Sequence, residues 1–439
     1  MEFASVISPM QVSELVETIE QGLAAYVPGR PDKFSALFSK AAFWKCVSAG
    51  KREGAILPKI ALTEFQFPIA FDQNTVSRAL RSGNTVCVSQ LDKASAELRE
   101  LCLAAEEALG FPGAASVHCY YSPPGTGFSF FHIDSGVAIT LQLEGEKKWQ
   151  YAERAAVPWS IRVGGYREGT RLEWFGDSDW EPKPGTVPSP QEQGFQERTL
   201  RPGDMLIIPP GVWHSACATD STSLSLNLKL TAEPSIESIL EVVRQACLVE
   251  ERWRGPFPFA SVEELRTGTI SERARREVKE RMLGVSQLIA RMAENDGDVS
   301  RLWFRNFLGS QDNLRGSDDV ELTDGDVVSI PPRVRPILSV APDGTAALLG
   351  QGRIVHIHGK GVAGLLQEIL RRRVFAISDV RSWRAAKGLD AAAIRKIALK
   401  LVGAGFLVKT PRTTTASKSV ARQTRAARVA RRTSRKAKG

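Results

Sequence analysis

The sequence predicts an α+β protein with a β-barrel or β-sandwich in its central part. Between Ala115 and about Leu230 the chain consists of short alternating or apolar segments punctuated by Gly and Pro, a pattern typical of many short strands joined by turns. Helical spacing precedes and follows this part. The length of 439 residues predicts about three domains, and 43% hydrophobic residues let each bury a core, which excludes a wholly disordered chain.

The first 110 residues or so mix helix-like and strand-like segments. An acidic amphipathic run extends from Ser95 to Leu109, and a short apolar run extends from Thr85 to Leu91. We therefore predict an α+β lead-in that forms one domain with the β-rich part, over residues 1–234.

The composition predicts a soluble cytoplasmic protein without a membrane partner. The N-terminal sequence carries acidic residues where a signal peptide would carry basic and then apolar ones, and the sequence has no run of about 18 uncharged apolar residues. Its six cysteines show neither CxxC spacing nor the density of a small disulfide-stapled domain, which suits a reducing compartment.

Six segments of the central part are predicted as strands. They are SVHCYY (116–121), FSFFHID (128–134), AITLQL (138–143), KKWQYA (147–152), DMLIIPP (204–210) and SLSLNLKL (223–230). The stretch from Glu153 to Pro202, which contains tryptophans and several prolines, is predicted as a long loop. Because such a loop inside a β-domain is usually functional or mobile, it is a candidate for covering a substrate, with an inert surface excursion as the alternative.

Residues 235–310 return to helical spacing, with an apolar stripe along one face. The stripe consists of Val278, Met282, Val285, Leu288, Ile289 and Met292. Such a stripe is more often core or a dimer face than a cofactor site. We therefore predict a helical, dimerisation-like region here.

Residues 311–410 show the pattern of a winged-helix domain. A hairpin that turns at Asp343-Gly344 and a strand at 353–359 precede three helices, and a wing strand follows at 406–410. The helices are predicted at about 361–373, from an N-cap at Ser378 and from an N-cap at Asp390. The third helix offers few basic side chains, which argues against sequence-specific DNA binding.

The net positive charge of the chain comes from its C-terminal tail. The chain has 58 basic and 49 acidic residues, a formal net charge of +9, but residues 411–439 contain ten basic residues and no acidic one. The tail is predicted to be disordered. Either it is simply solvated, or it attracts RNA, DNA or the ribosome without sequence preference through counterion release.

Two of the five histidines lie where they can bind a metal. In a strand, His132 and Asp134 project from the same face about 7 Å apart. The segment GDMLIIPPGVWHSA ends an apolar strand in a Pro-Pro-Gly turn and delivers His214 to the start of the next strand. Two imidazoles and one carboxylate on a β-scaffold suit a facial triad for non-haem Fe(II) with open positions. Zinc is the competing assignment, but it usually accompanies HExxH, which this sequence lacks.

These segments, HIDSGVAITLQLEGEKKWQYA and RPGDMLIIPPGVWHSA, resemble the core of the JmjC and cupin-like 2-oxoglutarate oxygenases, especially the bacterial ribosomal oxygenases. The resemblance is strong over about residues 80–230 and looser over the whole layout. It implies a double-stranded β-helix (jelly-roll or cupin) core, a helical region that forms a homodimer, and a C-terminal winged-helix domain. It also implies Fe(II), 2-oxoglutarate as cosubstrate and O2, with His132, Asp134 and His214 as iron ligands and catalytic residues.

The resemblance places three further residues near the cosubstrate. Lys147 stands where the family has the basic residue that pairs with the distal carboxylate of 2-oxoglutarate; only one of Lys147 and Lys148 can face inward, and the family offset selects Lys147. Ser129 stands where the family often has a hydroxyl on the same carboxylate, but it needs a β-bulge to face that way. Asn227 resembles a polar residue near the metal or cosubstrate, and a solvent-side strand amide is an equal alternative.

The activity that the resemblance implies is that of a 2-oxoglutarate-dependent dioxygenase hydroxylating a side chain of a protein or peptide, with a ribosomal protein as one candidate. Strands followed by three helices also resemble precursor-peptide recognition elements, so a tailoring hydroxylase of a ribosomally made peptide is the alternative. A metal-free cupin scaffold is the second alternative. The acceptor residue, the stereochemistry and the choice between hydroxylation and demethylation stay open.

Overall fold

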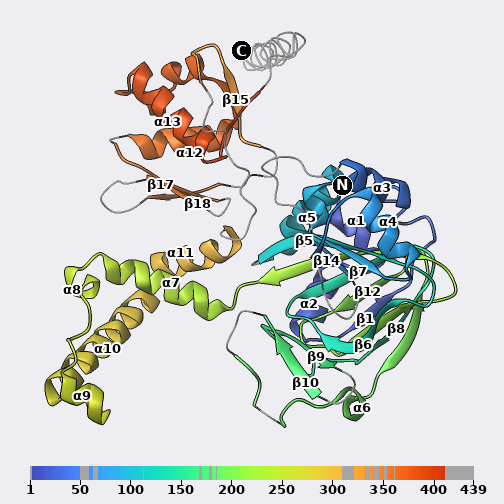
Figure 1. Cartoon of the computed structure of the whole chain (residues 1–439). Helices are drawn as coiled ribbons and strands as arrows, with labels where there is room; N and C mark the ends of the chain where they lie inside the picture. The colour runs from blue at the N-terminus through green and yellow to red at the C-terminus, as the bar shows by residue number, and fades with distance from the viewer. Residues whose placement is uncertain are drawn as a thin grey trace, which may run out of the picture. The chain divides into compact units, whose positions relative to one another are not determined.

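The computed structural model describes residues 2–49, 59–62, 68–111, 113–167, 171–176, 180–183, 185–308, 321–331, 334, 336–340, 346–350, 353–359 and 361–410. The chain forms two compact units, Met1–Ser310 and Gln311–Gly439 (Figure 1). The four-part domain division predicted from the sequence stays a prediction. The basic tail at 411–439 lies outside the described residues.

Two antiparallel sheets make up the β-domain of the first unit. The larger sheet has the order β1 (Ala25–Val27), β12 (Met205–Ile208), β7 (Val137–Glu144), β14 (Ser223–Ala232), β5 (Gly113–Ser122), β4 (Val86–Ser89), β2 (Lys59–Leu62) and β3 (Pro68–Ile69). The smaller sheet has the order β10 (Arg171–Phe175), β9 (Val163–Arg167), β6 (Gly127–Ile133), β13 (His214–Ala218), β8 (Lys147–Tyr151) and β11 (Gln196–Leu200). The predicted α+β, cupin-like architecture is thereby confirmed, with all six predicted strands present.

The N-terminal helices cover one face of the larger sheet (Figure 1). They are α1 (Phe3–Ile7), α2 (Val12–Glu20), α3 (Lys40–Ala49), α4 (Gln73–Arg81) and α5 (Ala96–Leu109). Leu224, Leu226 and Leu228 of β14 are buried in the core that these helices form with the sheet. Because successive residues of a strand point to opposite faces, the polar residues between these leucines face the smaller sheet.

Gly145 closes the turn between β7 and β8. Its φ is +64°, and a Cβ there would lie 2.0 Å from the carbonyl oxygen of Thr222. Only glycine tolerates both the left-handed backbone and this close approach. We expect Gly145→Ala to lower the free energy of unfolding by roughly 2 kcal/mol or more. Chemical denaturation measures this loss.

Gly83→Ala is the matched control for that variant. Gly83 also has a positive φ, +76°, but a Cβ there would meet open space among the described atoms. The loss of stability in Gly83→Ala therefore measures the cost of a positive φ alone, without a steric contact. Equal losses of stability in the two variants would contradict the role given to the Thr222 contact.

The stretch from Glu153 to Pro202 is not one long loop, so that prediction was wrong. It contains β9, β10, α6 (Pro190–Gln193) and β11, and β9 and β10 extend the smaller sheet beside β6. Strands β9 and β11 are hard to predict from the sequence. β9 contains the Gly164-Gly165 pair and β11 is mostly polar, so neither strand shows the alternating or β-branched pattern typical of a strand.

The helical region follows β14 in the first unit. It contains α7 (Ser235–Leu248), α8 (Glu251–Arg254), α9 (Val262–Thr267), α10 (Glu272–Ala293) and α11 (Asp296–Leu308). The predicted apolar stripe lies on α10, but α10 buries none of its residues and Met282 is 69% exposed. The stripe is therefore not core within this chain. No described helix is long and apolar enough to cross a membrane.

The described residues of the second unit form two small sheets and two α-helices. One sheet has the order β19 (Val374–Ala376), β15 (Val327–Ser329) and β20 (Val408–Lys409), and the other β16 (Ile337–Val340), β17 (Ala346–Gly350) and β18 (Arg353–Ile357). The helices α12 (Val362–Arg372) and α13 (Ala391–Gly403) occupy the positions predicted for the first and third helices, and Asp390 caps α13 as predicted. The predicted hairpin turn at Asp343-Gly344 lies outside the described residues, and the winged-helix assignment stays a prediction.

The predicted second helix of this unit is not an α-helix. The chain instead forms two 3₁₀ segments, Ile377–Ser382 and Arg384–Ala386. Along this stretch the buried residues Val380, Trp383 and Ala386 recur every third residue, which is the period of a 3₁₀-helix. Ser378 is a residue type that favours the start of a helix, but the three-residue spacing of the buried side chains favours a 3₁₀-helix over an α-helix.

Candidate active site

A pocket of about 1130 Å³ lies between the two sheets of the β-domain. Strands β6, β8, β9 and β13 of the smaller sheet supply one set of lining residues, and β4, β5 and β14 of the larger sheet supply another. The lining combines aromatic side chains with a few charged and polar groups. All six residues predicted as metal ligands or cosubstrate contacts line this pocket: His132, Asp134, His214, Lys147, Ser129 and Asn227.

Two histidines face each other in the pocket. His132 of β6 and His214 of β13 are register partners, and their ring centroids lie 4.2 Å apart. The Nδ1 of His132 lies 3.1 Å from the carbonyl oxygen of Phe130, and the Nδ1 of His214 lies 2.9 Å from that of Val212. Because a carbonyl only accepts, each Nδ1 donates. Each Nε2 is then left with the lone pair that a metal needs.

Both rings are held in the neutral form. Burial lowers the pKa of His214 to about 3, and burial also lowers the pKa of His132. A histidine must be neutral to coordinate a metal, and an ordinary histidine, with a pKa of about 6.5, is still partly protonated near neutral pH. Here the two rings are ready to coordinate without that step.

Asp134 lies at the end of β6 and is held by a lysine. Its Oδ1 lies 3.8 Å from the Nζ of Lys229 on β14. Burial acts to raise the pKa of Asp134, but the charges of Lys229 and of the surrounding histidines together outweigh it, and the pKa falls well below its usual range. Within the described residues, no three His, Cys, Asp or Glu side chains lie close enough together to hold a metal ion as they stand. The structure therefore brings the two imidazoles into contact and places the carboxylate in the same pocket, paired with Lys229.

Lys147, rather than Lys148, faces the pocket. The side chains of β8 alternate, so that Lys147 is 3% exposed, whereas Lys148 is exposed and lies 2.7 Å from Glu197. The Nζ of Lys147 lies 5.4 Å from the centre of the Tyr120 ring, and no acidic side chain among the described residues forms an ion pair with it. Burial lowers its pKa to about 8, which leaves it mostly charged at neutral pH. A buried cation without a partner requires an anion.

The other two predicted cosubstrate contacts differ in their surroundings. Asn227 is buried, and its Oδ1 accepts a hydrogen bond of 2.7 Å from Thr140, so it is not the solvent-side amide of the alternative reading. Ser129 borders the pocket but is exposed. The register of β6 on β13 shifts between the His132 and Phe128 pairings, but Phe128, Phe130 and His132 still share one face of β6, so the shift does not turn Ser129 toward His132. The roles of both residues stay predictions.

Sequence reasoning did not place Lys229 or Ser225 in the site. In the segment SLSLNLKL the leucines are buried on one face, while Ser225, Asn227 and Lys229 line the pocket from the other. This alternation is the signal that could have found them. It is ambiguous, because a polar face of a strand more often meets solvent.

Two buried polar atoms in the pocket lack partners. They are the Oγ of Ser225 and the Nε1 of Trp149, for which the described structure offers no hydrogen-bond partner. Ser225 is the register partner of Tyr120, the ring that Lys147 overlies. Since buried donors are rarely left unsatisfied, these atoms favour a polar ligand in the pocket.

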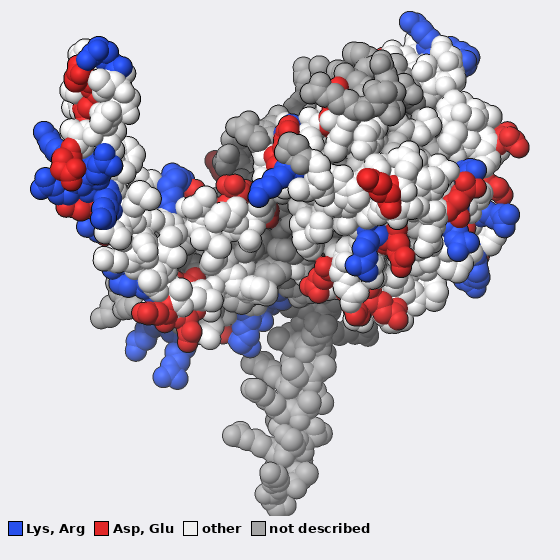
Figure 2. Space-filling model, turned by 90° about the horizontal axis from the view of Figure 1, so that it is seen from below, with Lys and Arg blue, Asp and Glu red and all other residues white. Residues whose placement is uncertain are grey.

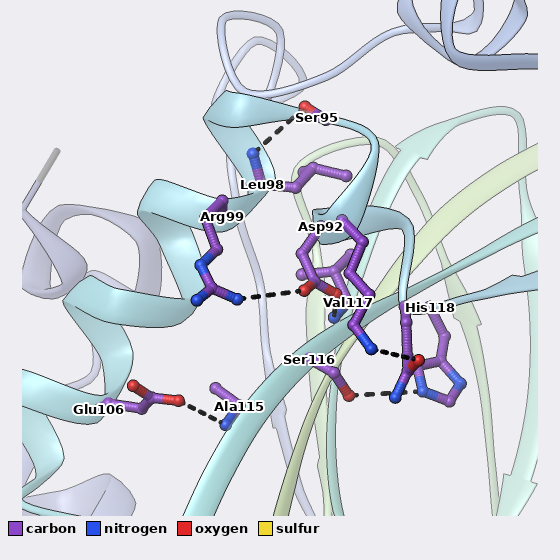
Figure 3. A network of polar contacts seen from close by, with 11 residues as sticks. Asp92, Ser95, Leu98, Arg99, Glu106, Ala115, Ser116, Val117 and His118 are labelled. Atoms are coloured by element: carbon purple, nitrogen blue, oxygen red, sulfur yellow. Dashed lines mark hydrogen bonds and ion pairs between the residues drawn. The ribbon is translucent and has the colours of Figure 1, made fainter. Parts of the chain in front are cut away.

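The edge of β5, the strand that carries Tyr120 into the pocket, is completed by carboxylates. β4 pairs with β5 as far as Cys119. Beyond that point the carboxylate of Asp92 accepts from the Val117 N–H at 2.8 Å, and the carboxylate of Glu106 accepts from the Ala115 N–H at 2.8 Å (Figure 3). Since Glu106 belongs to α5, the helix fixes the position of the strand directly. The pocket wall is thereby tied to the helical layer.

The donor set fits the metal and cosubstrate that the sequence predicts. Two neutral imidazoles with free Nε2 atoms and one ionised carboxylate match the ligands of a non-haem Fe(II) site with open positions. The buried ammonium of Lys147 and the unpartnered hydroxyl of Ser225 match a carboxylate. The arrangement suits a divalent metal beside a dicarboxylate.

Comparisons with known proteins match the β-domain to a known domain family. Residues 104–237 match the family model of the JmjC domain. The Bacillus subtilis protein YxbC, described as uncharacterized, is 26% identical over 141 residues, which is 31% of this chain and 39% of YxbC, so the match spans well under two thirds of that relative. The predicted resemblance to JmjC and cupin-like oxygenases is confirmed.

Solved structures of the Escherichia coli ribosomal oxygenase YcfD share the fold. The complex with cobalt and succinic acid matches with a TM-score of 0.50 at 14% identity, and the complex with cobalt and 2-oxoglutarate matches with 0.50 at 13%. Each match covers 91% of this chain and 98% of YcfD. The ligands of those complexes are consistent with the predicted Fe(II), 2-oxoglutarate and O2.

Proposed function

We propose that this chain is an Fe(II)- and 2-oxoglutarate-dependent oxygenase that hydroxylates a side chain of a protein or peptide. The JmjC match supports a 2-oxoglutarate oxygenase. The observation that carries the proposal is the pairing, in one pocket, of two neutral imidazoles with a buried lysine that has no acidic partner among the described residues. A metal-free scaffold would gain nothing from burying such a cation.

The residues of the pocket divide the work of binding. His132, His214 and Asp134 would hold the metal, and Lys147 would bind the distal carboxylate of 2-oxoglutarate with the Ser225 hydroxyl as a second donor. Bound Fe(II) would supply the activation of O2, with 2-oxoglutarate as the source of electrons. The remaining contribution of the protein is to fix the reacting groups and keep water away from them.

The walls of the pocket suit that second task. Phe128, Phe130 and His132 follow one another along the same face of β6, with Phe130 and His132 ring centroids 5.1 Å apart. Gly165 of β9 is the register partner of His132, and a Cβ there would meet the Phe130 ring at 3.4 Å. The absence of a side chain at Gly165 therefore leaves room beside the proposed metal position for the group to be oxidised.

We infer that the acceptor is a polypeptide, with a ribosomal protein as the leading candidate. The support is a fold shared over 91% of this chain with a protein described as a ribosomal oxygenase. On the face seen in Figure 2, basic and acidic side chains are interspersed, so no field of one sign dominates that face. The tail at 411–439 is then the expected contact with RNA, in the cytoplasm.

We also propose that the helical region forms a homodimer. Its helices expose large apolar side chains: Ile236, Leu240, Phe257, Phe259, Leu265, Met282, Leu283 and Trp303. Exposed apolar surface on this scale marks an interaction site. Sedimentation velocity of the full chain tests the proposal, and a monomer at all concentrations would contradict it.

The test of function begins with anaerobic titration of Fe(II) and 2-oxoglutarate, followed by an assay of succinate release in air. We expect a weak visible charge-transfer band and turnover that His132→Ala abolishes. Incubation with dissociated ribosomal proteins should then add the mass of about one oxygen to one of them. Neither band nor succinate would favour a scaffold. Oxidation of a linear precursor peptide, with every ribosomal protein unchanged, would move the substrate to the alternative class.

A further inference from the structure

We propose that Lys229 is a positioning residue that holds the Asp134 carboxylate in the metal-free protein and competes with the metal for it. The inference rests on the proposed ligand set of His132, Asp134 and His214. Its geometric basis is the 3.8 Å ion pair between Lys229 Nζ and Asp134 Oδ1, with both side chains 20% exposed. Lys229 thereby sets how tightly the site binds a divalent ion.

The pair joins the two sheets across the pocket. Lys229 lies on β14 of the larger sheet, with Ser116 and Ala138 as its register partners on the neighbouring strands. Asp134 follows β6 of the smaller sheet, and its carbonyl oxygen accepts a hydrogen bond of 3.0 Å from the Gly211 N–H. The backbone of Asp134 is therefore fixed near the proposed metal ligands. Its carboxylate can pair either with the Lys229 ammonium or with a metal ion.

Among the titratable groups near Asp134, Lys229 is the one that balances the negative charge of its carboxylate. His118 lines the pocket from β5, where its Nε2 lies 3.5 Å from the Ser116 Oγ. Burial, followed by the charge of Lys229, lowers the pKa of His118 to about 4, so this ring is neutral at pH 7. Lys229 is then the charged partner that the described residues give to Asp134.

Two consequences follow from electrostatics. A partly buried carboxylate without a counter-charge is unfavourable, so Lys229 stabilises the fold while no metal is present. A divalent ion bound to the same carboxylate supplies the counter-charge itself, so Lys229 is no longer needed for that purpose. The ion also lies close to the Lys229 ammonium, and the two positive charges repel each other. Lys229 therefore stabilises the metal-free state and weakens the metal-bound one.

The test uses the full chain, Mn(II) alone, and no 2-oxoglutarate or substrate. Lys229→Met removes the charge and keeps most of the volume, and Lys229→Gln is a second neutral variant. We expect both to bind Mn(II) at least about tenfold more tightly than wild type by calorimetric titration. Without metal both should melt at a lower temperature than wild type, and Mn(II) should raise their melting temperatures by more than it raises that of wild type.

Two controls frame the result. Lys229→Arg keeps the charge and should stay close to wild type in both measurements. Lys148→Met removes an exposed lysine of the neighbouring sheet and should change neither. Equal or weaker Mn(II) binding by the neutral variants, or an equal loss of melting temperature with and without Mn(II), would overturn the inference. Failure of every form, wild type included, to bind Mn(II) would instead overturn the metal site on which the proposed function depends.

Discussion

Replacing His214 with alanine should lower 2-oxoglutarate turnover by at least about 100-fold. His214 is 3% exposed, and its Nδ1 donates to the Val212 carbonyl, which leaves Nε2 as its metal-binding atom. Alanine has no atom that could bind the metal in its place. Loss of a partner outside the ligand set of a metal typically lowers affinity or activity by about 10- to 100-fold, and loss of a ligand should exceed that. Succinate release at saturating 2-oxoglutarate measures the effect.

Cys217→Ala is the matched control, because Cys217 lies three residues along the same strand β13 and is only partly buried. It should keep most of the activity, which would show that a change in β13 is not enough to stop turnover. If His214→Ala kept activity within about tenfold of wild type, the ligand assignment would be wrong.

Replacing Lys147 with methionine should raise the KM for 2-oxoglutarate by about 30- to 100-fold. A hydrogen bond to a charged group contributes about 2–3 kcal/mol when it is formed in a buried site, and each 1.4 kcal/mol corresponds to about a factor of ten. Mn(II) binding without cosubstrate should change little, because Lys147 lies beside Tyr120 rather than in the ligand set. Steady-state kinetics at varied 2-oxoglutarate measures the effect.

Lys148→Met provides the control next to it in the chain. Lys148 is exposed and pairs with Glu197, so its replacement should leave the KM unchanged. Equal KM values for the two variants would contradict a role for Lys147 in binding the distal carboxylate. A rise in KM for Lys148→Met alone would reverse the assignment of the two lysines.

The strands and the candidate ligands were predictable because each has a local signal. His132 and Asp134 stand two residues apart in a strand, and His214 follows a Pro-Pro-Gly turn. The strand pattern alone could not decide which face of KKWQYA points inward. That choice depends on the register of β8 on β13, which long-range pairing sets.

Other features depend on contacts that the sequence does not display. Lys229 belongs to an alternating strand whose polar face meets a pocket, although the same pattern describes a solvent face. Strand β9 carries the Gly164-Gly165 pair instead of an apolar alternation, and it pairs with β6 on one side and with β10 on the other. Where one α-helix was predicted, two 3₁₀ segments lie on either side of the buried Trp383. In each case tertiary packing overrides the local preference.

The orientation of both imidazoles is set by the main chain. Each ring donates to the carbonyl two residues before it, at Phe130 and at Val212. Side chains elsewhere in the pocket can therefore be exchanged without turning the rings. A lineage of such proteins is free to change what it recognises while keeping the same reactive centre, and an engineer can redesign the walls with the histidines left in place.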